Sequence, residues 1–307
     1  MTTEASANFP CFGSSCSVHV IGAGHAGDAD DAVAWAQRAL EGWHHQFSRF
    51  EPDSELSRLN ADHRHAVPVS PVMARFAEVV VQAGALTGGL VDATLLDELV
   101  AVGYAGDLAA PAPGGLGASL GAAPVRRPAA ASADARWRLL RVDRGENMVI
   151  RPPGLHLDSG GLAKGLFCDL LAEVLDTHDA FAVDCAGDVL VGGAAGVARP
   201  IHVGSPFGEG TLHSYESAGL AAATSGIGRR SWVGHDGAPA HHLLDPSTGL
   251  PAFTGIVQVT ALATTATLAE ICAKAAILAG PEAAAGWLPH GGVIVHDDGS
   301  FDVVAAS

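Results

Sequence analysis

The chain has 307 residues, of which 48% are hydrophobic and 16% charged, with 17 Lys and Arg against 33 Asp and Glu. This length allows one large domain or two ordinary ones, and the hydrophobic content is sufficient to bury a core. The formal net charge of -16 argues against nucleic acid and anionic membranes as partners, because such surfaces are bound through basic patches. An anionic ligand would need a local group of cations.

The apolar segments are too short to cross a bilayer, which takes about 18 or more consecutive apolar residues. The best candidate, 256–269, is short and rich in Thr. The first ten residues contain Glu4 and no basic group before an apolar run, so we expect no signal peptide, no membrane insertion and a cytoplasmic protein. The five cysteines are odd in number and lie among apolar neighbours, which predicts reduced core thiols.

The N-terminal part is expected to contain one strand and two helices. Alternation predicts a strand at 16–21, and apolar residues at helical spacing predict a helix over 30–47. A second helix is predicted over 71–87, with Ser70 as its N-cap and a proline in its first turn. Residues 105–135 are mostly Ala, Gly and Pro, which predicts a poorly ordered surface loop without secondary structure.

Beyond that loop, strands outnumber helices. Helices are predicted over 163–176 and 267–279, the second closed by Gly280 and Pro281. The predicted strands are 138–142, 148–151, 180–185, 201–204, 220–224 and 256–263. Because strands and helices do not alternate regularly, we expect a single α+β domain over residues 1–307, with a mixed, largely antiparallel sheet and flanking helices.

A glycine pattern typical of dinucleotide binding, G-x-G-x-x-G, spans residues 22–27 between the first strand and the first helix. Such a motif needs a helix N-terminus that accepts a pyrophosphate. Here the helix opens with Asp28, Asp30 and Asp31, which would occupy the positive end of the helix dipole and repel phosphate. A Gly-rich turn with acidic capping is favoured, and a Rossmann-type oxidoreductase remains a remote alternative.

Two segments predict polar chemistry. Gly160 and Gly161 lie between an apolar run at 155–157, expected to be a strand, and a helix with Lys164 in its first turn. Free backbone N–H groups and an ammonium at such a turn suit a phosphate, although a helix start that needs Gly only for packing explains the same residues.

Adjacent histidines precede a Pro/Gly turn at 245–249. One imidazole there suits proton transfer. We favour His242 for this role, with a pKa near neutrality, and expect His241 to be a partly exposed polar residue. Glu270 and Lys274 lie four residues apart in an apolar helix. Two interpretations of this spacing are open: an ordinary ion pair within the helix, and a charged pair that faces a polar site.

Seven ordered blocks resemble the FAD:protein FMN transferase family, also called the ApbE family, over nearly the whole chain. The blocks are Phe12-Gly13-Ser14, 47–60, 89–95, 157–165, 184–188, Thr224-Ser225-Gly226 and 241–249. The resemblance implies a T-fold-like domain that binds FAD, splits its pyrophosphate and attaches FMN through a phosphoester bond to a Thr or Ser of an acceptor flavoprotein. A member that only binds FAD, or hydrolyses it to FMN and AMP, is the alternative.

The resemblance also implies site residues. His242 would be the catalytic base, and the residues expected to contact FAD are Phe12, Phe50, Leu90, Val91, Asp92, Asp158, Lys164, Ser225, Gly226, Leu243 and Leu244. The backbone of Gly161 and the side chains at 270 and 274 correspond to the family's Mg²⁺ ligands, where Asp and Thr are usual. An ammonium cannot ligate Mg²⁺, so we predict that Lys274 stands in for the cation. A milder departure is Ala186, which replaces a Gly.

Overall fold

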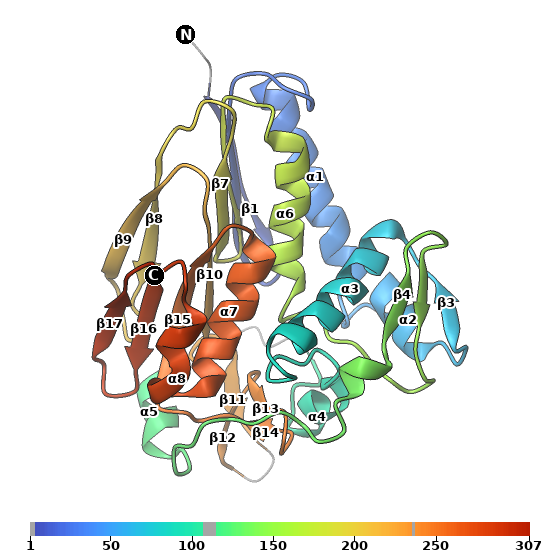
Figure 1. Ribbon diagram of the computed structural model, residues 1–307, viewed down its shortest axis with the longest axis vertical. Coiled ribbons are helices and arrows are strands. Elements are labelled where there is room, and N and C mark those ends of the chain that lie inside the picture. Colours follow the sequence, from blue (N-terminus) through green and yellow to red (C-terminus); the bar gives the residue numbers. More distant parts are fainter. Residues whose placement is uncertain (1–3, 107–114, 235–236) are drawn as a thin grey trace.

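The computed structural model describes residues 4–106, 115–234 and 237–307, and its centre is an eight-stranded sheet (Figure 1). Every pairing within this sheet is antiparallel. In spatial order the strands are β1 (Glu4–Cys11), β2 (Ser14–Ile21), β6 (Ala180–Cys185), β7 (Asp188–Gly192), β10 (Ala221–Gly226), β15 (Ile256–Ala263), β16 (Gly292–His296) and β17 (Phe301–Val304). The predicted α+β class with a largely antiparallel sheet is confirmed.

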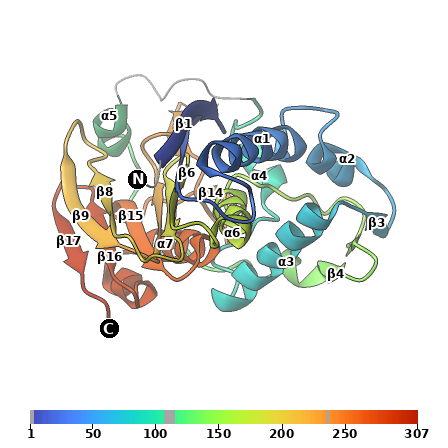
Figure 2. The same cartoon turned by 90° about the horizontal axis from the view of Figure 1, so that it is seen from above.

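Three helices cover one face of the sheet: α1 (Ala29–Phe47), α6 (Ala163–Leu175) and α7 (Ala266–Ala279) (Figures 1 and 2). The hairpin of β8 (Arg199–Gly204) and β9 (Thr211–Ser217) covers part of the other face, where Ile201 packs with Ala222 and Leu262. Because both faces of its centre are covered, β15 is apolar along nearly its whole length.

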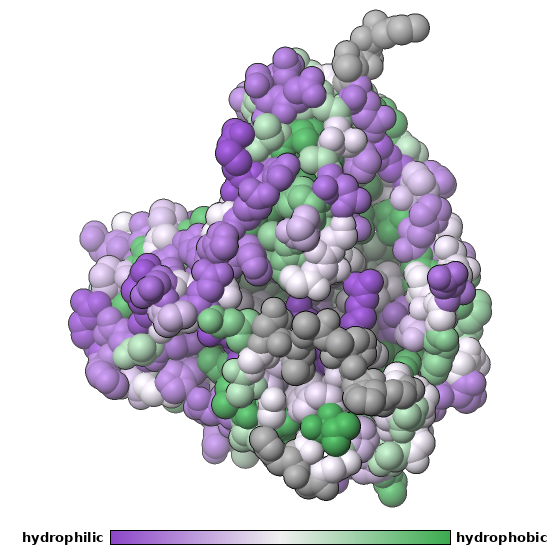
Figure 3. All heavy atoms as spheres, turned by 180° about the vertical axis from the view of Figure 1, so that it is seen from behind, coloured by the Kyte–Doolittle hydropathy of each residue, from purple (hydrophilic) through white to green (hydrophobic). Residues whose placement is uncertain are grey.

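The smaller units surround the helical side and the lower end in Figure 1. The helices are α2 (Glu55–Ala61), α3 (Pro71–Leu86), α4 (Leu96–Ala101), α5 (Gly115–Gly121) and α8 (Pro281–Ala284), with 3-10 turns at Arg136–Leu139 and Ala285–Trp287. One small sheet contains β3 (Ala66–Pro68), β5 (Met148–Ile150) and β4 (Arg141–Asp143). Two hairpins pair β11 (Ser231–Val233) with β12 (Pro239–His241) and β13 (Leu244–Asp245) with β14 (Leu250–Pro251). Hydrophilic side chains predominate over the part formed by α2 and the β3–β5 sheet (Figure 3).

The helix boundaries follow the capping signals of the sequence. Ser70 caps α3 by accepting a hydrogen bond from the Met73 amide, and a proline opens the first turn. Asp28 caps α1 in the same way through the Asp31 amide. The glycine segment before α1 therefore ends in an acidic cap. Because β2 pairs antiparallel with both of its neighbours, the parallel unit of a Rossmann fold is not present there.

Close packing between two helix starts positions the functional residues. A Cβ on Gly165 would lie 2.6 Å from the backbone oxygen of Ala266, so only glycine allows α6 to approach α7 this closely. Asp169 of α6 strengthens the contact, since its carboxylate accepts hydrogen bonds from the amides of Ala266 and Thr267. The first turns of both helices thereby face one another.

Several predicted elements differ from the structure. Residues 138–142 divide between a 3-10 turn and β4. The elements that were not predicted include β1, β3, β7, β9, β11, β12, β13, β14, β16, β17, α2, α4 and α8. Residues 155–157 are not a strand, because the side chain of Asn60 bonds both the amide and the carbonyl of Leu157 in place of a neighbouring strand. All five cysteines are free and buried, as predicted.

The prediction of no secondary structure over 105–135 is wrong, because α5 lies within it. Part of this range, 107–114, is outside the described residues. The segment after α5 is held by hydrogen bonds from the Arg127 amide to Phe253 and from the Ala129 amide to Leu278. Arg126 also pairs with Asp297 at 2.8 Å. Backbone pairing of this kind is open to small residues, so composition alone did not reveal it. Among the described residues, no helix is both long and apolar enough to span a membrane.

Ala186 provides a test of the backbone geometry at the β6–β7 turn. Its φ of 58° lies in the left-handed region, which costs a non-glycine residue about 1 kcal/mol. Ala186→Gly should therefore raise the free energy of unfolding, by up to about 1 kcal/mol. The control is Ala182→Gly within β6, where φ is not positive, and it should lower stability by about 0.5–1 kcal/mol. Urea denaturation measures the stability of both variants. A loss of stability in Ala186→Gly would contradict the left-handed backbone conformation at this position.

Candidate functional site

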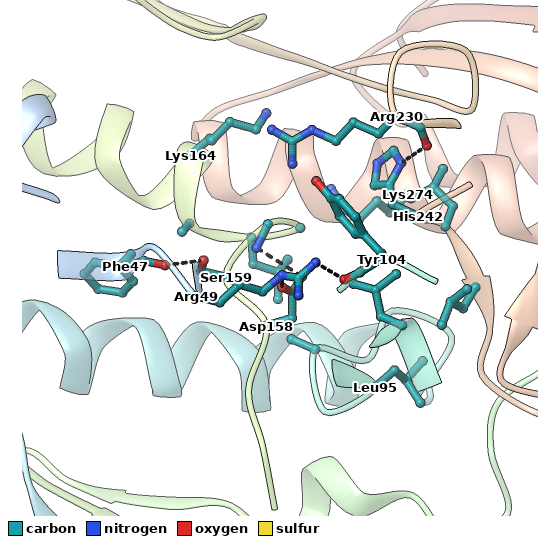
Figure 4. Close-up of a pocket in the computed structure, with 18 of the residues that line it drawn as sticks. Phe47, Arg49, Leu95, Tyr104, Asp158, Ser159, Lys164, Arg230, His242 and Lys274 are labelled. Carbon is teal, nitrogen blue, oxygen red and sulfur yellow. Dashed lines mark hydrogen bonds and ion pairs between the residues drawn. The ribbon is translucent and has the colours of Figure 1, made fainter. Parts of the chain in front are cut away.

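A cavity of about 320 Å³ opens where the first turn of α6 and the C-terminal half of α7 meet the loops after α1 and α3 and the strand β13 (Figure 4). Most of the residues predicted to form the site line it: Phe12, Phe50, Leu90, Val91, Asp92, Asp158, Gly161, Lys164, His242, Leu243, Leu244 and Lys274. Ser225 and Gly226 are not part of the lining and instead pair with β15. Glu270 lies just behind the wall, bonded to lysines that line it.

Buried charges form the wall between α6, α7 and β7. Lys164 Nζ lies 2.5 Å from Asp188 Oδ2 and 3.8 Å from Glu270 Oε1, and Lys274 Nζ lies 3.3 Å from the same Glu270 oxygen. The other Glu270 oxygen accepts a hydrogen bond from the Gly165 amide at 3.0 Å. Both carboxylate side chains are 1% exposed. Because unpaired buried charges are costly, these four groups must occur together.

The pKa values of this group follow from burial and pairing. Burial opposes the charge on Lys164, but Asp188 and Glu270 outweigh it and raise the Lys164 pKa. Burial also opposes ionisation of Glu270, yet Lys274 and Lys164 hold its pKa below the usual value. Burial raises the pKa of Asp188 although Lys164 opposes the shift. Lys164 and Glu270 are therefore charged at neutral pH.

Arg230 is a further cation of the cavity that the sequence prediction left out. It reaches toward Lys164 across the cavity (Figure 4), and its Nη2 donates to the Phe12 carbonyl at 3.1 Å. Within the described part of the chain, no carboxylate forms an ion pair with it. Its position after β10 gave no local signal, since an Arg-Arg pair is equally typical of an exposed turn.

A platform of two aromatic rings and a guanidinium forms another side of the cavity, with the Phe50 and Tyr104 rings inclined at 63° to one another. The Arg49 guanidinium lies 4.3 Å from the Phe50 ring centre and 4.4 Å from that of Tyr104. Arg49 is fixed by Asp158 at 3.4 Å and by the Tyr104 carbonyl at 2.6 Å. Phe50 is 39% exposed and offers a surface for a planar ring, whereas Tyr104 is 5% exposed and packs between Arg49 and Trp232. Arg49 and Tyr104 were not predicted as site residues; Tyr104 is brought here only by tertiary packing against Trp232.

The Gly160-Gly161 turn differs from the predicted phosphate cradle. The Gly160 amide is not free, because it donates to Asp158 Oδ2 at 3.1 Å. Burial raises the pKa of Asp158, while Arg49 opposes the shift. A Cβ on Gly161 would lie 2.9 Å from Lys274 Cε. The second glycine thus makes room for the lysine side chain.

The two histidines also differ from the prediction. His241, expected to be partly exposed, is 2% exposed and stacks edge-on against Phe253. His242 lines the cavity and its Nδ1 lies 3.4 Å from the Arg230 carbonyl. Burial, together with Arg230, lowers the His242 pKa well below its usual value, so the predicted near-neutral pKa is wrong. Desolvation, which a sequence does not reveal, explains both differences.

The residues present do not fit a magnesium site at the predicted position. Both oxygens of Glu270 are already bonded, and two ammonium groups lie within 4 Å of it. Over residues 4–106, 115–234 and 237–307, no group of three or more His, Cys, Asp or Glu side chains could hold a metal ion. Mg²⁺ requires several oxygen ligands in near-octahedral geometry.

The ApbE family model matches residues 12–295, which is most of the chain. The chain belongs to the ApbE family. Two curated relatives, each named FAD:protein FMN transferase, match along most of its length. The Vibrio cholerae protein is 26% identical over 97% of this chain and 90% of its own, and the Klebsiella pneumoniae protein is 27% identical over 87% and 76%.

Solved ApbE structures share the fold. The ApbE protein of Thermotoga maritima aligns with a TM-score of 0.76 at 22% identity, covering 98% of this chain and 97% of that one. The flavin transferase ApbE of Vibrio cholerae aligns with a TM-score of 0.74 at 23% identity, covering 100% and 98%. The prediction of an ApbE-type α+β domain is therefore confirmed.

Burial of His241 predicts a specific loss of stability in acid. Burial lowers its pKa to about 3, whereas the unfolded chain binds a proton at this ring below about pH 6.5. The stabilising contribution is therefore complete above that pH and declines as pH falls toward about 3. Between about pH 7 and about pH 5.5 the wild-type chain should lose about 1 kcal/mol through this residue.

Urea denaturation of wild type and His241→Phe at both pH values measures this effect. The variant should be less sensitive to acid by that amount, whatever its stability at neutral pH. An equal pH dependence in both chains would contradict a buried, neutral His241.

Proposed function

We propose that this chain is a FAD:protein FMN transferase that binds FAD in the cavity and transfers FMN to a Thr or Ser of an acceptor flavoprotein. Membership of the ApbE family and the names of its curated relatives support the activity. The main support from the structure is that one cavity has an aromatic side, with the exposed Phe50 ring, and a cationic side, with Lys164, Lys274 and Arg230.

Each side matches one chemical part of FAD. The exposed Phe50 ring, with the Arg49 guanidinium over it, suits a flat heteroaromatic system. Lys164, Lys274 and Arg230 suit the diphosphate, since cations within hydrogen-bonding distance bind phosphate oxygens strongly. In a chain of net charge -16, this local cluster is what allows an anionic ligand to bind.

His242 is suited to accept a proton from the acceptor hydroxyl. Its Nδ1–H donates to the Arg230 carbonyl, which leaves the lone pair of Nε2 available. The lowered pKa keeps the ring neutral at physiological pH. In the proposed reaction the hydroxyl oxygen attacks the FMN phosphorus, the bond from that phosphorus to the oxygen of AMP breaks, and the proton passes to Nε2.

The acceptor test uses FAD and the soluble proteins of the source organism. Covalent flavin should become visible as fluorescence in a denaturing gel, and mass spectrometry should find FMN on a Thr or Ser of one protein, with AMP released in equal amount. Release of free FMN and AMP with no labelled protein would show hydrolysis instead of transfer.

Loss of the Lys164 charge should weaken FAD binding selectively. Lys164→Gln should reduce FAD affinity by about tenfold or more but change riboflavin affinity little, because riboflavin carries no phosphate. Arg75→Gln is the control, since it removes a cation that pairs with Glu173 outside the cavity lining and should not weaken FAD. Flavin fluorescence titrations measure all three proteins; equal losses for both ligands in Lys164→Gln would contradict the role.

Replacement of His242 should separate catalysis from binding. His242→Ala should slow transfer by about 100-fold or more, as expected for loss of a general base, while FAD affinity changes by less than about threefold. His241→Phe should keep most of the activity. If His242→Ala retained its transfer activity, a group other than His242 would have to accept the proton.

A further inference from the structure

Lys274 lines the cavity beside Glu270. Its Nζ is 3.3 Å from Glu270 Oε1, and only 11% of its side chain is exposed. Its stem passes Gly161 so closely that a Cβ there would come within 2.9 Å of Cε. Gly161 therefore leaves space for the Lys274 side chain, and the Glu270 carboxylate holds its ammonium group in place.

Lys274 adds a third cation to the wall between α6, α7 and β7. Without it, Lys164 and Arg230 would be balanced by Asp188 and Glu270, and the wall would be neutral. With it, three cations face two carboxylates. The rest of the lining contains the Arg49–Asp158 pair, whose carboxylate also faces Arg230 and Lys274, and the carboxylates of Glu51 and Asp92. The lysine thus makes the wall positive before any ligand binds, which is the condition an anionic diphosphate requires.

The same arrangement disfavours a divalent cation. An ion beside Glu270 would lie close to two ammonium groups that share one of its oxygens, while the other oxygen is taken by the Gly165 amide. Mg²⁺ prefers carboxylate and water oxygens at about 2.0–2.1 Å. Neither the charge nor the available oxygens suit it.

We propose that this chain binds the diphosphate of FAD without a divalent metal, using Lys274 as a built-in cation, with Arg230 and Lys164 as the other phosphate-binding groups. This inference rests on the proposed FAD binding. It goes further by assigning Arg230 to phosphate recognition and by making the chain independent of Mg²⁺. An ammonium supplies charge and donors but no coordination sphere.

The first experiment titrates FAD and ADP into the full chain, by calorimetry, in EDTA and in excess Mg²⁺. Wild-type affinity for each ligand should differ by less than about twofold between the two conditions. Arg230→Gln should weaken both ligands by about tenfold in either condition and leave riboflavin nearly unchanged. The matched control is Arg199→Gln, which removes a mostly buried arginine that pairs with Glu4 away from the cavity and should change nothing.

The second experiment converts the site. Glu270→Asp with Lys274→Thr supplies oxygen ligands in place of the ammonium, so FAD binding should weaken about tenfold in EDTA and recover with Mg²⁺. Glu270→Gln with Lys274→Met removes both buried charges and avoids a stranded carboxylate. It should bind FAD weakly with or without Mg²⁺, and a chain that keeps full affinity in this form would overturn the role of Lys274.

A gain of about tenfold in wild-type FAD affinity on adding Mg²⁺ would overturn the inference and leave the proposed function intact. No binding of FAD by wild type in either condition would instead overturn the proposed function. Titration of Mn²⁺ alone, followed by electron paramagnetic resonance, gives a readout that does not involve FAD. Wild type should leave Mn²⁺ free, and tight binding of one ion would contradict the inference.

Discussion

The buried ion-pair group of Lys164, Lys274, Asp188 and Glu270 is the interaction on which the site depends. Each carboxylate lies almost completely out of solvent, and removing one partner would leave an uncompensated buried charge, which typically costs about 3–5 kcal/mol. The four residues come from α6, α7 and the start of β7. These elements can meet only because Gly165 allows the two helices to approach one another. The close packing of α6 against α7 therefore also determines the charge of the cavity wall.

This constraint also explains how an acidic protein accepts an anionic ligand. The overall charge of -16 is spread over the chain, and long-range repulsion between exposed charges is screened by salt. The cations of the cavity wall are shielded from solvent and are screened far less. Local charge, and not net charge, decides what the cavity binds.

Much of the fold was predictable from local signals. The caps of α1 and α3, the antiparallel class and the helices α6 and α7 follow from residues close together in sequence. The apolar run at 155–157 could not be assigned correctly, because its hydrogen-bond partner is the Asn60 side chain, far away in the chain. The segment after α5 likewise could not be predicted, because it is held by hydrogen bonds to backbone groups that are distant in sequence.

The site residues that belong to family motifs could be predicted from the sequence. The contacts and pKa shifts that depend on burial could not. Phe12, Asp158, Lys164 and His242 were predicted from family motifs, and all four line one cavity. Arg49, Tyr104 and Arg230 join them through tertiary packing, and the pKa shifts of both histidines follow from desolvation, which depends on the whole fold.

The most direct test is a crystal structure of the chain with FAD, grown in Mn²⁺ and measured at the manganese absorption edge. Metal-independent binding through Lys274 predicts that the diphosphate contacts Lys164, Lys274 and Arg230, that the flavin or adenine ring lies against Phe50 and Arg49, and that no anomalous peak lies beside Glu270. A manganese peak bridging Glu270 and the diphosphate, with Lys274 turned away, would contradict it.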